Sequence, residues 1–149
     1  MGTEHASRPV VVAVDFSDVG KGVVAQAVEL AQALHAPLYL IHVAEPEPDL
    51  VGYQAGPQHE RDRHAREYRE EHRELQALAE RLRELGLDAT PILAQGPAAE
   101  KITHEAKKLS ARLLVIGRHS RSTIGEIIAG SVAREILQNP PCAVVVVPA

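Results

Sequence analysis

Short apolar runs recur along the chain and are separated by segments whose apolar residues follow helical spacing. Each run is five or six residues long and rich in Val, Ile, Leu or Ala, which is typical of buried strands. The runs predict five strands, at Pro9–Val14, Leu38–Val43, Asp88–Leu93, Arg112–Ile116 and Ala143–Val147.

The segments between these runs predict four helices. The first begins at Ser17 or Asp18, either of which can cap a helix N-terminus, and ends near His35. The third opens at Gly96-Pro97, with Pro97 near the first helical position, and the fourth covers Ser131–Gln138 before Asn139-Pro140-Pro141 stops it.

The second helix, His59–Leu85, is the longest and changes character along its length. Its first half carries Arg and Glu at spacings of three and four residues, which indicates a solvated face of paired charges. Its apolar positions predict packing against a sheet rather than a coiled-coil seam; they are Tyr68, Leu75, Leu78, Leu82 and Leu85. Gly86 then ends the helix.

Strict alternation of strands and helices predicts a doubly wound α/β fold with a parallel sheet and helices on both faces. The 149 residues are enough for one domain, and we expect residues 1–149 to form it. Pro91 places its strand at an edge of the sheet, because proline cannot donate to a neighbouring strand.

Composition and charge narrow the classes of function. The formal net charge is −4 and basic residues are interspersed with acids, which argues against binding to nucleic acid or to an anionic membrane. No apolar run reaches the roughly 18 residues of a membrane span. Cys142 is the single cysteine, so an intrachain disulfide is impossible, and we expect a cytoplasmic protein.

Polar and glycine residues follow two of the predicted strands. Asp15 comes after the first strand and Gly117 after the fourth. Ligands of open α/β sheets bind beyond the carboxyl ends of the strands, at the point where strand order reverses. If the first and fourth strands are neighbours, Asp15 and Gly117 face one crevice.

The segment from Gly117 to Ser131 suits a phosphate. Gly130-Ser131 directly precedes a helix, whose N-terminus exposes N–H groups and the positive end of the helix dipole. The Ser131 hydroxyl adds a donor, and Arg118 and Arg121 carry positive charge. From the residues alone, two readings stand side by side: a phosphate cradle, or a glycine turn with a Gly-Ser helix cap and no ligand.

This segment resembles the nucleotide signature of the universal stress protein family, Gly-x2-Gly-x9-Gly-(Ser/Thr), with Gly117, Gly130 and Ser131 in place. Further parts of the chain resemble the family in order and spacing. They are the opening Val11–Ser17, His42-Val43, Gly96-Pro97-Ala98, Val132-Ala133 and the ending Cys142–Val147.

The resemblance implies strand order 3-2-1-4-5, in a fold similar to the adenine nucleotide alpha hydrolase class, and a site for ATP with Mg²⁺. Adenine would lie near Val43, ribose near Asp15, and phosphates along Gly117–Ser131, with Mg²⁺ against Asp15. The implied nucleotide-binding residues are Ala13, Asp15, Ser17, Val43, Gly117, Arg118, His119, Ser120, Arg121, Gly130, Ser131 and Val132. Family dimers often pair through the last strand, here Ala143–Val147, which implies a homodimer.

One position departs from the signature, because Ser120 stands where the family has its second glycine. If that position needs positive φ, a non-glycine residue costs about 1–2 kcal/mol, or roughly 5- to 30-fold in binding. The main alternative is therefore a family member that binds no nucleotide and acts through an unidentified protein partner. The loop Glu45–Gln58 is either a lid over the adenine or a connector.

A second alternative is a slow ATP hydrolase. The chain has no P-loop of the form Gly-x4-Gly-Lys-(Ser/Thr), and no clear general base stands beside Asp15. His119 is the one candidate base within the loop. Turnover by an enzyme of this kind would be at most weak.

Overall fold

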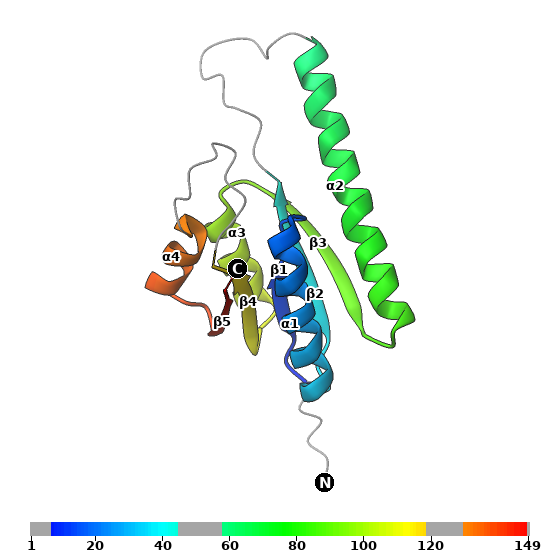
Figure 1. The fold of residues 1–149 in the computed structure, drawn as a ribbon. Helices are drawn as coiled ribbons and strands as arrows, with labels where there is room; N and C mark the ends of the chain where they lie inside the picture. Colours follow the sequence, from blue (N-terminus) through cyan, green and yellow to red (C-terminus); the bar gives the residue numbers. More distant parts are fainter. Residues whose placement is uncertain (1–6, 45–57, 119–129, 149) are drawn as a thin grey trace.

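The computed structural model describes residues 7–44, 58–118 and 130–148, and only the backbone of residues 18, 19 and 60. Its strands are β1 (Val10–Ala13), β2 (Leu38–Ala44), β3 (Ala89–Gln95), β4 (Leu113–Gly117) and β5 (Ala143–Val147). All paired neighbours are parallel and the order is β3-β2-β1-β4-β5 (Figure 1). The predicted fold class and strand order are confirmed, and Pro91 lies in an edge strand.

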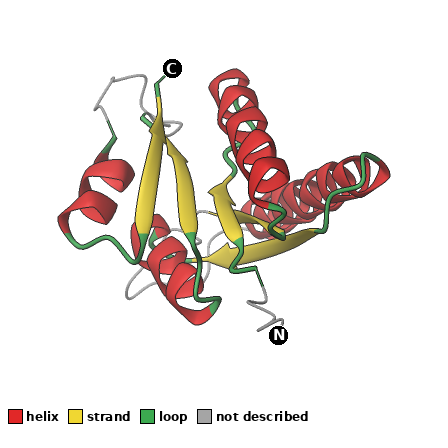
Figure 2. Cartoon of the chain, turned by 90° about the horizontal axis from the view of Figure 1, so that it is seen from below, coloured by secondary structure: helices red, strands yellow, loops and turns green. Residues whose placement is uncertain are grey.

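In the described parts of the chain, four helices cover the sheet: α1 (Asp18–Leu34), α2 (Gln58–Glu84), α3 (Ala98–Lys108) and α4 (Ser131–Gln138). The helices α1 and α2 lie on one face, and α3 and α4 lie on the other (Figure 2). This follows from right-handed crossovers: the chain runs outward from β1 to β3, then returns to β4 and runs outward the other way.

The sheet is buried between two apolar layers. Val10 and Val12 of β1 face the layer that α1 and α2 cover, whereas Val11 faces α3 and α4. All three valines are 0% exposed. Side chains of a strand alternate between the two faces, so a central strand covered on both faces has to be apolar throughout.

The ends of the elements show how the sequence sets them. Ser17 caps α1, accepting a hydrogen bond from the Gly20 N–H at 3.0 Å. Gly86, at φ 90°, and Leu87 donate to the carbonyls of Arg83 and Leu82, a closing pattern that needs a residue in the left-handed region after α2. Pro97 is the N-cap of α3 rather than its first helical residue, because its ψ of 121° is extended.

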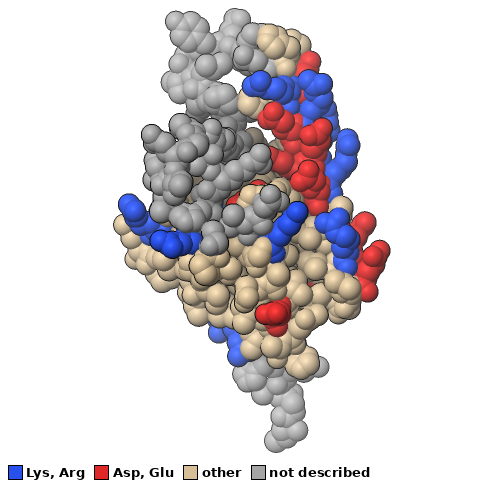
Figure 3. Space-filling model, in the orientation of Figure 1, with Lys and Arg blue, Asp and Glu red and all other residues tan. Residues whose placement is uncertain are grey.

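The prediction that five apolar positions of α2 face the sheet is wrong for two of them. Leu75 and Leu82 are buried and Leu78 packs against the same core, but Tyr68 is 38% and Leu85 69% exposed. The N-terminal half of α2 stands beyond the ends of the strands, and Leu85 follows the last helical residue (Figure 1). Charged side chains gather along this helix (Figure 3).

None of the helices in the described parts of the chain combines the length and the apolar character needed to cross a membrane.

Candidate functional site

Asp15 is fixed in the turn that connects β1 to α1. Its Oδ1 accepts hydrogen bonds from the Ser17 backbone N–H at 3.0 Å and from the Ser17 hydroxyl at 2.7 Å. Just before it, the Val14 N–H donates to the Ile41 carbonyl at 2.8 Å, which continues the pairing of β1 with β2. Both hydrogen bonds to Asp15 end on Oδ1, so Oδ2 is the oxygen to consider for a ligand.

Two backbone features hold this turn tightly. A Cβ at Gly20 would collide with the Asp15 carboxylate, so the first turn of α1 leaves room for that carboxylate only because Gly20 has no side chain. Phe16 has φ 57°, in the left-handed region that costs a residue with a side chain about 1–2 kcal/mol. Strain of this size is often found at functional sites.

Gly130 and Arg118 meet at the end of β4. Gly130 is the N-cap of α4 with φ 61°, and a Cβ there would lie 2.5 Å from the Arg118 carbonyl oxygen. The Arg118 N–H in turn donates to the Val147 carbonyl at 2.9 Å, which ties the end of β4 to the end of β5. The start of α4 therefore lies directly against the residue that follows Gly117.

The two halves of the predicted site share one edge of the sheet. Because β1 and β4 are paired neighbours, with Val12 opposite Val115, the Asp15 turn and the Gly117–Arg118 end emerge side by side. The condition set from the sequence for a common crevice is thus met. This edge is also where strand order reverses, with β2 on one side of β1 and β4 on the other.

The remaining predicted residues fall into three groups. Ala13 and Val43 are half-buried at the ends of β1 and β2. Ser131 is exposed at the start of α4, and Val132 packs against the core below α3 and α4. The predictions for His119, Ser120 and Arg121, and for the loop Glu45–Gln58 except Gln58, concern residues that lie outside the described part of the chain.

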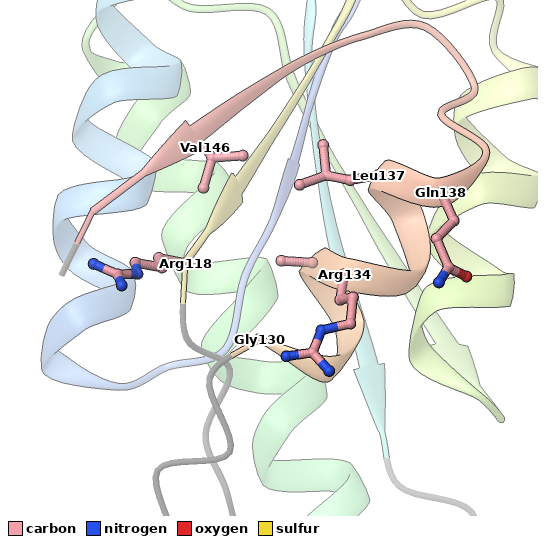
Figure 4. A pocket seen from close by; sticks show the side chains of 7 residues that line it. Arg118, Gly130, Arg134, Leu137, Gln138 and Val146 are labelled. Atoms are coloured by element: carbon pink, nitrogen blue, oxygen red, sulfur yellow. The ribbon is translucent and has the colours of Figure 1, made fainter.

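A groove beside Gly130 was not predicted. It has a volume of about 430 Å³, and it is lined by Arg118, Gly130, Ala133, Arg134, Leu137, Gln138 and Val146. Figure 4 shows Leu137 and Val146 inside it and the two arginines towards one end. The four lining residues of α4 follow i, i+1, i+4 and i+5 spacing, which the sequence does show. The exposure of Val146 on β5, which completes the groove, could not be predicted from the sequence.

The described residues offer few other candidates for binding or catalysis. The residues that the structure describes include no group of three His, Cys, Asp or Glu side chains able to hold a metal ion. Burial raises the pKa of the Cys142 thiol, and the charge of Arg8 lowers it by less. A thiol of this kind is a poor nucleophile at neutral pH, consistent with the packing of Cys142 against the core.

The fold and this edge define a class: a doubly wound α/β protein with a carboxylate turn and a glycine-capped helix at its switch point. The universal stress protein family matches residues 6–148, and this chain belongs to that family.

Proteins of this family are similar to the chain over nearly its whole length. Universal stress protein YxiE of Bacillus subtilis is 31% identical over 141 residues, which are 91% of this chain and 95% of that protein. A universal stress family protein from Burkholderia pseudomallei is 27% identical, covers 100% of both chains and has a TM-score of 0.71. A universal stress protein from Archaeoglobus fulgidus in complex with dAMP is 26% identical, with 93% and 95% covered and a TM-score of 0.63.

Proposed function

We propose that this protein binds an adenine nucleotide, ATP with Mg²⁺, between the carboxyl ends of β1 and β4, and that binding switches its association with partners during stress. The observation that carries the proposal is that a fixed carboxylate, Asp15 after β1, and a glycine N-cap, Gly130 against the end of the neighbouring strand β4, lie at one edge of the sheet. The dAMP complex of the Archaeoglobus fulgidus relative supports an adenine nucleotide as the ligand.

The residues suggest how the parts of a nucleotide would be held. Half-buried Ala13 and Val43 offer apolar surface for adenine, and Asp15 Oδ2 offers an acceptor for a ribose hydroxyl. The α4 N-terminus and Arg118 suit phosphates, since free N–H groups and a guanidinium both donate to anions. The close approach of Gly130 to the Arg118 carbonyl leaves no room for a side chain, as a backbone cradle requires.

Magnesium would come with the nucleotide rather than occupy a site made by the protein. The described residues contain no cluster of ligands for it, so the phosphates would supply most of its oxygens and Asp15 at most one.

We further propose that the protein is a homodimer paired through β5. We also propose that it acts in the cytoplasm, where its one cysteine, Cys142, would stay reduced.

Calorimetric titration of nucleotide-stripped protein with Mg-ATP tests the proposal. We expect micromolar binding that is weakened by at least about tenfold in Gly130→Asp, since that side chain would carry negative charge into the cradle. Gly22→Asp is the matched control, because a Cβ at Gly22 meets nothing within 4 Å. No binding to wild type, or equal loss in both variants, would contradict the proposal.

A further inference from the structure

His42 is a buried polar residue that the proposed nucleotide site does not yet explain. It lies in β2 and is 9% exposed. Among the described residues, it is the only polar or charged one that is buried. Its ring stands against the Phe16 ring, with centroids 4.7 Å apart and planes tilted by 53°. A polar side chain costs free energy to bury unless its nitrogens are satisfied, so the partners of each nitrogen matter.

The Nδ1 atom holds the backbone just before Asp15. It lies 2.6 Å from the Val14 carbonyl oxygen. A carbonyl oxygen only accepts, so Nδ1 must carry the proton and donate it. The His42 ring therefore contacts the residues on both sides of Asp15: it is hydrogen-bonded to Val14 and packs against Phe16.

The Nε2 atom points towards α2. It is buried, and it makes no hydrogen bond within the part of the chain that the structure describes, yet Glu71 Oε2 lies 3.2 Å away, at ion-pair distance but poorly aligned. In the neutral ring Nε2 presents a lone pair to this carboxylate, because Nδ1 holds the proton. In the imidazolium it presents a proton, and the contact becomes an ion pair between α2 and the sheet.

We propose that His42 is a positioning residue of the nucleotide site, which fixes the Asp15 turn through Nδ1 and connects that turn to α2 through Nε2 and Glu71. The expected effect on nucleotide affinity rests on the proposed function, whereas the contacts of His42 do not. The single ring bridges the Val14 carbonyl, the strained residue Phe16 and Glu71 of α2, the helix whose N-terminal half stands beyond the strand ends. A change in the position of α2 therefore reaches Asp15 through one side chain.

The protonation pattern can be tested first in the unaltered protein. Nitrogen-15 NMR of the histidine rings should show His42 with a proton on Nδ1, whereas a free imidazole side chain favours the proton on Nε2. A neutral His42 ring with its proton on Nε2 alone would overturn the proposal, because Nδ1 could then not donate to Val14.

Two substitutions then separate the two nitrogens. The amide of His42→Asn can reach the position of Nδ1, and the amide of His42→Gln can reach the position of Nε2. We expect His42→Asn to bind Mg-ATP within about threefold of wild type and His42→Gln about tenfold more weakly, the loss of one short buried hydrogen bond. Equal affinities in the two folded variants would overturn the positioning role.

The connection to α2 is measured by hydrogen exchange at the Ser17 amide, which is bonded to Asp15. In Glu71→Ala we expect this amide to exchange about three to ten times faster than in wild type. Exposed Glu74, one turn further along α2, gives the control Glu74→Ala, which should leave the rate unchanged. An unchanged rate in Glu71→Ala would overturn the link to α2.

These readouts keep the two proposals apart. If wild-type protein does not bind Mg-ATP while His42 holds its Nδ1 proton and Glu71→Ala loosens Ser17, the nucleotide function is wrong and the positioning geometry stands. If wild type binds and the His42 variants do not differ, the function stands and the positioning role is wrong.

Discussion

Among single residues, Gly20 and Ser17 together determine the position of the Asp15 carboxylate. Gly20 has no side chain, and the Asp15 carboxylate lies where its Cβ would be. Ser17 uses one hydroxyl twice, donating to Asp15 and accepting from Gly20. The cap of α1 and the orientation of Asp15 are therefore set by the same three residues.

Gly20→Ala should weaken nucleotide binding while Gly22→Ala should not. Alanine in the interior of a helix is favoured over glycine by about 1 kcal/mol, so Gly22→Ala should raise the free energy of unfolding by about this amount. At Gly20 the same methyl group displaces Asp15, and we expect affinity for Mg-ATP to fall about tenfold. Titration calorimetry and urea unfolding of both variants check this, and equal affinities would contradict the role of Asp15.

At the scale of elements, α2 combines a docked half with a half that stands clear of the sheet. Leu75 is 0% exposed and belongs to the core beneath α1 and α2. The earlier turns carry paired charges such as Arg63 and Glu67, which lie 3.8 Å apart on the exposed surface. Exposed pairs of this kind contribute little to stability, so the docked half holds the helix.

Leu75→Ala and Leu85→Ala test this division. Removing a fully buried leucine costs about 2–5 kcal/mol of unfolding free energy, whereas a substitution at an exposed position usually stays within about 0.5 kcal/mol. Leu85 is 69% exposed and is the control. Urea denaturation should therefore separate the two variants clearly, and similar losses would show that the end of α2 is packed as its sequence pattern predicted.

The elements were largely predictable and the contacts between them were not. Runs such as Val10–Ala13 are apolar because the central strands are covered on both faces, so they stand out in the sequence. Helical spacing identified the docked face of α2, but it carries no information on how far the sheet extends, so Tyr68 and Leu85 were wrongly expected to be covered. The Asp15–Gly20 contact and the groove beside Gly130 depend on how residues approach one another in the folded chain, which the spacing of residues in the sequence does not show.

At the scale of the whole molecule, the two edges of the sheet differ. The edge strand β3 contains Pro91, which lacks a backbone N–H to donate to another strand, and α2 packs against this strand. The edge strand β5 is a run of Ala and Val with no proline, and Val146 is 37% exposed beside Leu137 at 49%. An uncovered apolar edge strand readily pairs with another chain, so we expect the two subunits of the dimer to pair through β5.

Val146→Lys should convert a β5-paired dimer into a monomer, because a charge on the paired strand would be buried in the interface without a partner. Leu85→Lys places the same charge on an exposed leucine that follows α2 and should leave the dimer intact. Light scattering after size-exclusion chromatography gives both masses. A dimer that persists in Val146→Lys would place the interface elsewhere.

A nucleotide site between β1 and β4 can be located by titrating nitrogen-15-labelled protein with Mg-ATP and following the backbone amides by two-dimensional NMR. We expect the largest shifts at the turn from Asp15 to Ser17, at Gly117 and Arg118, and from Gly130 to Val132, with the docked half of α2 responding less. Shifts confined to other surfaces, or no shifts with ATP well above micromolar concentration, would contradict a nucleotide site between β1 and β4.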